Sequence, residues 1–271
     1  MKAILKHIRP CLLAFSAVLA LASCSVKEDR RPCPGYLYVS FAGKEAIDET
    51  VGLLGWAQTE RFRDTVNVSE VEDYWMRAVR HEVFELTSYR GAETAKPENH
   101  VIILPEGHQC DSLYAWHEEV DCTQGDAYAE VVFRKQFCTV YIDFVSSSVD
   151  RMQDMKVLVE GNTCGFDLLD FSPVAGPFSF APVSADGTVW SLRIPRQADE
   201  SLRLSVWSRP DSSSEWAGPK EFPVGEYIVK TGYDWAAEEL EDVFIKVDFV
   251  LGFVTVGIAD WEDGGNIYVI R

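Results

Sequence analysis

Short runs of β-branched and aromatic residues, separated by turn residues, extend along nearly the whole chain after residue 35. Alternation of apolar and polar residues is typical of β-strands with one buried face. It is clear in Leu37 to Phe41 and in Phe137 to Val145. Sustained helical periodicity is absent, and only residues 60–73 and 235–242 are ambiguous. The pattern predicts an all-β chain, with turns spaced as in β-sandwiches.

The expected strands fall into two sets on either side of the polar residues 146–150. Trp75 to Val79 and Val83 to Tyr89 flank Arg80-His81 and are expected to form a hairpin. We therefore expect an N-terminal domain over residues 36–147 and a C-terminal domain over residues 148–271. The expected strands are 37–41, 75–79, 83–89, 101–104, 112–117, 127–133, 137–145, 155–160, 178–180, 189–194, 202–207, 226–231, 243–250, 253–258 and 267–270.

The first residues have the pattern of an export signal. Basic residues precede an apolar run from Cys11 to Leu21, which is too short for the roughly 20 residues that span a bilayer. The run ends in Leu21-Ala22-Ser23-Cys24, which has the form of a lipobox. We expect a signal peptide over residues 1–23 and lipidation of Cys24. The alternative is an ordinary signal peptide followed by a chance cysteine.

Residues 24–35 are expected to be the lipidated cysteine and its polar tether. Two or more acyl chains hold a protein stably at a membrane, and a diacylglyceryl cysteine, usually also N-acylated, meets that need. An Asp directly after the lipidated cysteine would suggest retention in the inner membrane, but residue 25 is Ser. The run Lys27-Glu28-Asp29 resembles a short surface-export signal. These features favour a surface-exposed outer-membrane lipoprotein over a periplasm-facing one.

Composition excludes one class of partner. The formal net charge is −18, and removal of the basic signal segment makes the remaining body more acidic still. An acidic body repels phosphate backbones, so we expect no nucleic-acid binding. An aromatic content of 12% is enough for real hydrophobic cores, which excludes a disordered spacer.

The cysteines leave their pairing open. Once Cys11 is cleaved off and Cys24 is acylated, the remaining cysteines are Cys33, Cys110, Cys122, Cys138 and Cys164. Cys110 and Cys122 form a possible disulfide across a hairpin, in a compartment that permits disulfides. Buried free cysteines acting as small hydrophobic residues are the alternative.

No known catalytic or metal motif is present. A nucleophile elbow, an HExxH helix and a phosphate-binding glycine loop are all missing from the sequence. Two acidic runs are interpreted as solvated charge, because a catalytic carboxylate pair needs a cleft. We therefore expect no enzyme activity, no catalytic residue and no cofactor. The acidic residues concerned are Glu118, Glu119, Asp121, Asp260, Glu262 and Asp263.

One group of residues has the ligand types of a zinc site. His108, Cys110, His117 and Cys122 supply the nitrogen and sulfur ligands that zinc prefers. Their spacing matches no recognised zinc finger, and an oxidising compartment favours a disulfide over thiolate ligands. We expect no metal here.

The tryptophans suggest an alternative function. Exposed indole rings stack on sugar faces, so a surface glycan-binding lipoprotein is the second hypothesis. Several tryptophans alternate with β-branched residues, however, as core residues do. Trp216, which follows a serine-rich stretch, is the best candidate for exposure. The full set is Trp56, Trp75, Trp116, Trp190, Trp207, Trp216, Trp235 and Trp261.

Four segments together have the pattern of a known family. They are Cys24 followed by Cys33-Pro34, Pro105-x-Gly107 with Tyr114-x-Trp116, Val157-x-Val159-Glu160-Gly161, and the closing pattern from Asp242-Val243 to Trp261. In these segments, which cover nearly the whole chain after Cys24, the sequence resembles the FimB-like anchor and minor-subunit lipoproteins of type V fimbriae in Bacteroides-type bacteria.

The resemblance implies two tandem transthyretin-like (Greek-key) β-sandwich domains and a structural role. That role is to attach a fimbria to the outer membrane, limit its length and support cell adhesion, with other fimbrial subunits as partners. Related fibres assemble by strand addition, in which one subunit completes the sheet of another. Stalk subunits lose their first strand to proteolysis, whereas an anchor keeps it. Arg30 and Arg31 depart from this picture, because cleavage there would release the body.

Overall fold

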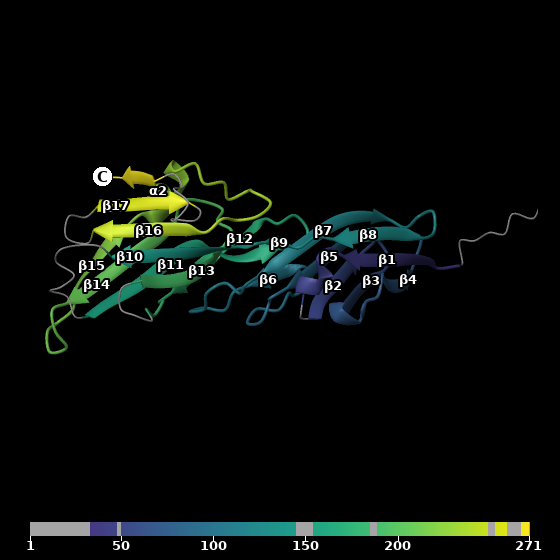
Figure 1. The fold of residues 1–271 in the computed structure, drawn as a ribbon, viewed down its shortest axis with the longest axis horizontal. Helices are drawn as coiled ribbons and strands as arrows, with labels where there is room; N and C mark the ends of the chain where they lie inside the picture. Colours follow the sequence, from purple (N-terminus) through teal and green to yellow (C-terminus); the bar gives the residue numbers. More distant parts are fainter. Residues whose placement is uncertain are drawn as a thin grey trace, which may run out of the picture.

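The computed structural model describes residues 33–47, 50–144, 154–184, 189–248, 253–258 and 267–270. Figure 1 shows an elongated molecule in which the early strands occupy one end and the late strands the other. Strand β1 begins at one tip, and β17 and the C-terminus lie toward the opposite tip. The prediction of an all-β chain is confirmed.

The N-terminal sandwich is formed by two sheets. One has the order β4-β1-β8, and the other has the order β3-β2-β5-β7-β9. Their bounds are β1 Gly35–Phe41, β2 Thr50–Trp56, β3 Arg61–Asn67, β4 Trp75–Val79, β5 Val83–Arg90, β7 Tyr114–Asp121, β8 Ala127–Val131 and β9 Arg134–Lys135; two short 3-10 helices are η1 Lys44–Ala46 and η2 Val68–Glu70.

The C-terminal sandwich also has two sheets. One has the order β13-β10-β16-β17-β18, and the other has the order β12-β11-β14-β15, with β6 joined to β11. Their bounds are β6 Val101–Ile103, β10 Phe137–Phe144, β11 Asp154–Asp167, β12 Pro173–Phe180, β13 Val189–Pro195, β14 Arg203–Arg209, β15 Ala217–Phe222, β16 Val243–Asp248, β17 Phe253–Ile258 and β18 Ile267–Ile270; the helix α2 is Val224–Lys230.

The two sandwiches place their first strands in the same way. In the N-terminal sandwich, β1 lies between antiparallel β4 and parallel β8. In the C-terminal sandwich, β10 lies between antiparallel β13 and parallel β16. A first strand paired on both edges, with one antiparallel and one parallel neighbour, is therefore common to both halves of the molecule.

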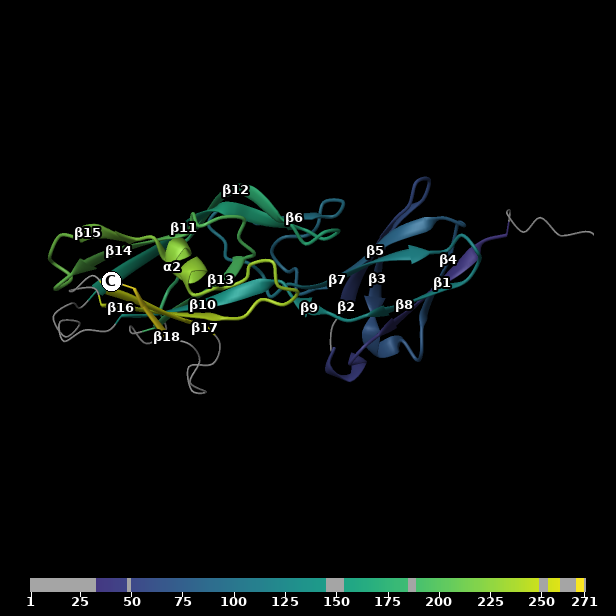
Figure 2. The same ribbon diagram turned by 90° about the horizontal axis from the view of Figure 1, so that it is seen from above.

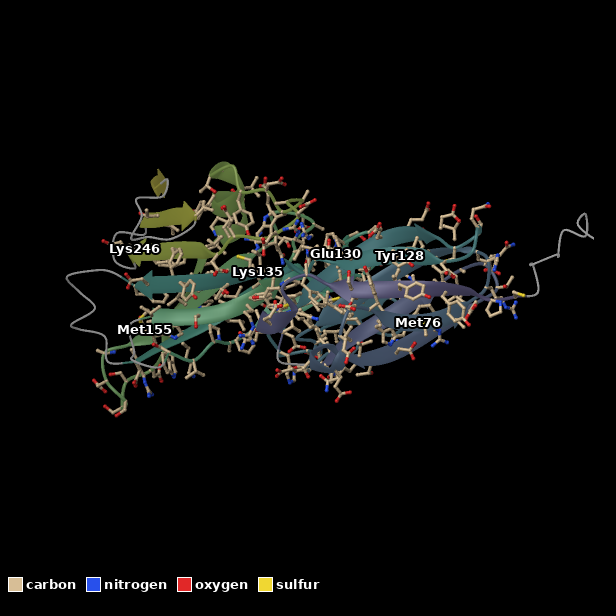
Figure 3. The ribbon with its side chains drawn as sticks, turned by 45° about the vertical axis from the view of Figure 1, so that its right-hand side comes forward. Met76, Tyr128, Glu130, Lys135, Met155 and Lys246 are labelled. Carbon is tan, nitrogen blue, oxygen red and sulfur yellow. The ribbon has the colours of Figure 1, made fainter. Side chains whose placement is uncertain are left out.

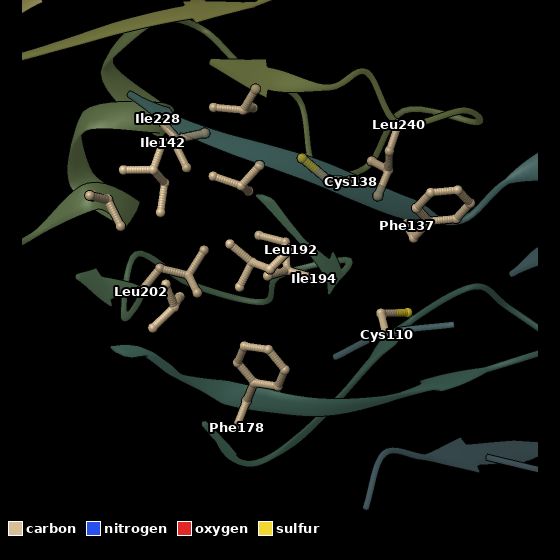
Figure 4. Close-up of a cluster of buried hydrophobic side chains, with 14 of the residues drawn as sticks. Cys110, Phe137, Cys138, Ile142, Phe178, Leu192, Ile194, Leu202, Ile228 and Leu240 are labelled. Atoms are coloured by element: carbon tan, nitrogen blue, oxygen red, sulfur yellow. The ribbon is translucent and has the colours of Figure 1, made fainter. Parts of the chain in front are cut away.

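Each sandwich encloses its own core. Alternation along β1 buries Leu37, Val39 and Phe41, which pack with residues such as Phe84 of β5. Figure 4 shows the C-terminal core, where the side chains come from both sheets and from α2. The residues labelled there include Ile142, Phe178, Leu192, Ile194, Leu202 and Ile228.

The structure corrects the domain boundary expected at residues 147 and 148. Strand β10 pairs only with strands of the C-terminal sandwich, and Phe137, Val140 and Ile142 belong to its core. The chain passes between the sandwiches before Phe137. The polar residues 146–150 suggested a domain boundary. Composition alone does not distinguish a linker between domains from a polar segment that joins two strands of one domain.

Two local predictions were also wrong. The expected hairpin around Arg80 does not form, because β4 pairs with β1 whereas β5 pairs with β2 and β7 in the other sheet. The strand expected at residues 226–231 is mostly helix α2, which buries Val224, Gly225 and Ile228. Burial at positions four apart is helical spacing, which the β-branched composition of this segment concealed.

Candidate functional site

Strand β1 completes both the smaller sheet and the core of the N-terminal sandwich. Leu37 and Val39 are fully buried, and β1 is hydrogen-bonded along both of its edges, to β4 and to β8. Without β1, its two neighbours would each present an unpaired edge over an open apolar core. Strand β1 therefore occupies the place between β4 and β8 where a strand from another protein would otherwise bind.

The chain enters β1 through a tight contact. A Cβ atom on Gly35 would lie 2.5 Å from the carbonyl oxygen of Gly125, so only glycine fits without displacing backbone. Next to it, the Tyr36 amide donates a 3.2 Å hydrogen bond to Asp126 Oδ1. Cys24, the predicted lipidation site, lies outside the described residues, as do Lys27, Arg30 and Arg31.

A segment of the N-terminal half crosses to the C-terminal sandwich. Between β5 and β7, the chain leaves its own sheets and β6 pairs antiparallel with the end of β11, with Ile102 opposite Phe166. The Leu104 amide donates to the Cys164 carbonyl at 2.8 Å, and the Leu168 amide donates to the His100 carbonyl at 2.9 Å. Figure 2 shows β6 between the two sandwiches. We call residues 91–113 the strap.

Side chains strengthen this crossing. His100 Nδ1 lies 2.9 Å from Asp167 Oδ1, and the His100 ring meets the edge of Trp56. At the other end of the strap, Arg193 Nε donates to the Cys110 carbonyl at 2.9 Å, while the Cys110 amide donates to the Arg193 carbonyl at 2.9 Å. The strap is therefore fixed to the C-terminal sandwich at both ends.

The direct connection between the sandwiches is held by a buried arginine. Arg196 is 4% exposed, and its guanidinium donates to Gln136 Oε1 at 2.7 Å and to the Ala237 carbonyl at 2.8 Å. Gln136 lies in the short link between β9 and β10, and its own amide group donates to the Glu238 carbonyl at 3.1 Å. The strap and the Arg196–Gln136 contacts therefore connect the two sandwiches at two separate places.

The proposed disulfide is not formed. Cys110 and Cys122 are both free and buried, and they belong to different cores: Cys110 packs in the C-terminal core and Cys122 in the N-terminal core. The strap carries Cys110 away from β7, so the two thiols do not face each other across a hairpin. Both residues act as small hydrophobic side chains, the alternative left open by the sequence.

Burial predicts the order in which the thiols react. Loss of solvent raises the pKa of Cys110 and of Cys138 to about 12, and that of Cys122 to about 11. A thiol with a raised pKa stays protonated near neutral pH, and only the thiolate attacks an alkylating reagent. Cys33 is exposed. With iodoacetamide on the native protein, mass spectrometry should find Cys33 modified long before these three, and equal modification would contradict the buried placement.

The four residues with the ligand types of a zinc site do not come together. His117 Nε2 is 2.7 Å from Glu85 Oε2 across β7 and β5, and exposed His108 contacts the Glu106 carbonyl. Cys110 and Cys122 lie in separate cores. Glu118, Glu119 and Asp121 are on β7, whereas Asp260, Glu262 and Asp263 lie outside the described residues.

The tryptophans are mostly packed. Trp116 and Trp190 are buried, and Trp56, Trp75 and Trp235 pack against the two cores. Trp216 was expected to be exposed, but its ring is covered by Lys156 Nζ at 4.2 Å and by the Arg209 guanidinium at 4.6 Å. Trp261 lies outside the described residues. Within the part of the chain that the structure describes, the exposed aromatic side chains are tyrosines: Tyr36, Tyr74 and Tyr128. No sequence pattern singled them out.

Comparison with known proteins identifies the fold. No protein-family model matches the chain, and no curated protein matches its sequence. Among the residues that the structure describes, no helix is long and apolar enough to cross a membrane.

Three solved structures share this architecture. A candidate polysaccharide-binding protein from Bacteroides thetaiotaomicron has a TM-score of 0.60 at 11% identity, with 88% of this chain and 98% of that chain covered. A candidate adhesin from Bacteroides ovatus has a TM-score of 0.58 at 10% identity, covering 88% and 96%. The fimbrial anchor protein Mfa2 from Porphyromonas gingivalis has a TM-score of 0.53 at 11% identity, covering 84% and 98%. The chain therefore has the fold of these proteins along nearly their whole length.

Proposed function

We propose that this chain is a lipid-anchored structural subunit at the outer-membrane end of a fimbria, and that it has no catalytic role. The observation that carries the proposal is the first strand, which lies at the centre of its sheet and is paired on both edges. Similarity of fold to a fimbrial anchor protein and to a candidate adhesin supports it. Lipidation of Cys24 is part of the proposal.

The retained strand gives the fibre a defined end. In assembly by strand addition, backbone hydrogen bonds and alternate side chains of the incoming strand complete an open sandwich. Here Leu37 and Val39 already fill that position, so the N-terminal sandwich has no vacancy to offer a second subunit. A subunit that cannot be extended at this end terminates the fibre, which also limits the fibre's length.

The same strand connects the lipid to the body. Cys24 precedes Gly35 by a short tether, and β1 continues from that tether into the core. Tensile force on the fibre is then resisted by the backbone hydrogen bonds on both edges of β1 and by the contacts between the sandwiches. The next subunit would join elsewhere, through strand addition at another sheet edge. Cleavage after Arg30 or Arg31 would cut this connection and release the body.

Replacing the lipidated residue tests the proposal. Cys24→Ser removes the thiol that accepts diacylglycerol, so the chain should move from the outer-membrane fraction to the soluble fraction and the cells should shed fimbriae. Cys33→Ser, at an exposed cysteine in the same region, is the matched control and should stay in the membrane. Fractionation with immunoblotting and electron microscopy of the cells measure both effects. Retention of the Cys24→Ser chain in the membrane would refute lipid anchoring.

Fimbrial attachment needs a separate readout. Deleting the gene should release the fimbriae or lengthen them. Cells that keep firmly attached fibres of unchanged length would argue against the anchor role even if Cys24 carries a lipid. A pull-down from outer membranes should then identify which subunits accompany the chain.

A further inference from the structure

Tyrosines gather on the outer face of the sheet β4-β1-β8. This face carries Tyr36 and Tyr38 from β1, Tyr128 from β8, and Met76 from β4, with Tyr74 immediately before β4. Tyr74 is 50% exposed, Met76 is 55% exposed and Tyr128 is 62% exposed, although all are large apolar side chains. Figure 3 shows Met76, Tyr128 and Glu130 on this part of the N-terminal sandwich. We call these five residues the tyrosine face.

The rings of the tyrosine face contact one another. Tyr38 stacks on Tyr128 with ring centroids 4.9 Å apart and planes 12° apart, and it meets Tyr74 edge-on at 6.1 Å. Tyr74 also meets Tyr128 edge-on at 5.7 Å. Because strand backbones and mutual ring contacts hold them, these aromatic side chains are ordered before any ligand arrives, which lowers the entropic cost of binding.

A groove continues from one side of the tyrosine face. It has a volume of about 510 Å³, within the range of ligand sites, and lies between β3 and β4, which are both edge strands. Tyr74, Trp75 and Met76 form its apolar side. Its polar side contains Thr65, Asn67, Glu70 and Glu72. The Asn67 amide group donates to Glu70 Oε1 at 2.8 Å, which holds these polar groups in position.

The chemistry of this surface selects one class of ligand. Aromatic rings match the C–H faces of sugar rings, and carboxylates and amides match sugar hydroxyls. Glu70 and Glu72 line the groove and Glu130 stands beside Tyr128, whereas Lys44 donates to the Val71 and Glu72 carbonyls. Three carboxylates against this one ammonium leave the surface negative, which disfavours acidic polymers and anionic lipids. A second copy of this chain, with a net charge of −18, is disfavoured for the same reason.

We propose that the tyrosine face and its groove bind a neutral polysaccharide. The site lies on the N-terminal sandwich and does not depend on lipidation or on fibre assembly, so it goes beyond the function proposed above. Polysaccharide binding would add recognition of a glycan-coated surface to the chain's structural role. It also differs from the sequence-based glycan hypothesis, which relied on tryptophans: Trp116 and Trp190 are buried, and the ring of Trp216 is covered by Lys156 and Arg209.

Binding to defined polysaccharides tests the proposal. The full chain, purified in detergent, is run in affinity gels containing dextran, laminarin or yeast mannan, with polygalacturonate as the acidic comparison. At least one neutral polymer should retard the protein, and polygalacturonate should not. Tyr128→Ala and Tyr74→Ala should each weaken binding about tenfold, the loss expected when one stacking ring is removed. Tyr128→Phe, which keeps the ring, should bind nearly as the parent protein does.

Controls separate stacking from general surface change. Val183→Ala alters an 89% exposed apolar side chain in the C-terminal half and should leave binding unchanged. Absence of binding to all three neutral polymers, or equal binding by Tyr128→Ala and the parent, overturns the proposal. Loss of a co-purifying protein from the Tyr128→Ala variant, without any glycan binding, would instead assign the face to a protein partner.

Discussion

Leu37→Asp is expected to unfold the N-terminal sandwich, whereas Tyr38→Asp at the next position should leave it folded. Leu37 is fully buried at the centre of β1. Its cross-strand partners are Ala127 and Arg77, and the Arg77 guanidinium is already paired with Asp64 at 2.6 Å, so a new carboxylate would be buried without a cation of its own. Burying an unpaired charge costs several kcal/mol, which is comparable to the roughly 5–15 kcal/mol that holds a domain together.

Tyr38 gives the matched control because successive side chains of a strand point to opposite faces. Its ring lies on the outer face of the sheet with Tyr128, so a carboxylate at this position remains hydrated. Differential scanning calorimetry measures both variants. The Leu37→Asp protein should lack the unfolding transition of the N-terminal sandwich and lose the near-UV circular dichroism of buried Trp116, while the control keeps both. Similar melting of the two variants would mean that β1 does not complete this core.

The fold class was predictable because it depends on local alternation. Leu37, Val39 and Phe41 alternate with polar or aromatic residues, and the structure buries these three. Which strand pairs with which depends on contacts far apart in sequence, and no local pattern encodes them. Val101–Ile103 was correctly predicted as a strand, yet its partner is β11 of the other sandwich. The same lack of long-range information misplaced the domain boundary and suggested the Cys110–Cys122 pair.

The candidate glycan site was missed for a related reason. Tyr36 and Tyr38 alternate with Gly35, Leu37 and Val39, so both faces of β1 have apolar or aromatic side chains and the sequence does not reveal which face is exposed. Tyr74 and Tyr128 are far from β1 in sequence, and they join it only through the sheet β4-β1-β8. Glu130, two residues after Tyr128, was the one local sign that this face of β8 is turned to solvent.

The second large effect is expected at the junction between the sandwiches. Gly165 of β11 lies against β6, and a Cβ at this position would be 2.4 Å from the Ile102 carbonyl oxygen and 2.8 Å from Ile103 Cδ1. Gly165→Val therefore forces β6 away from β11. The Ile102 side chain, now 4% exposed, would lose its place in the C-terminal core. The strap would then be held at one end only, by Arg193.

Hydrogen exchange and small-angle scattering measure this change. Amides of residues 101–103 should exchange about 100-fold faster in Gly165→Val, as expected from losing the burial of one isoleucine. The radius of gyration should rise, because the angle between the sandwiches would lose the β6–β11 ladder and depend on the contacts around the short link, Gln136–Arg196 and Lys135–Asp242, and on the Arg193 end of the strap. Ile103→Ala is the control, since that side chain is 49% exposed and its replacement leaves the ladder to β11 intact. Unchanged exchange and scattering in Gly165→Val would mean that the strap does not hold the two sandwiches together, and the stiffness needed to transmit force from fibre to membrane would have to come from the short link alone.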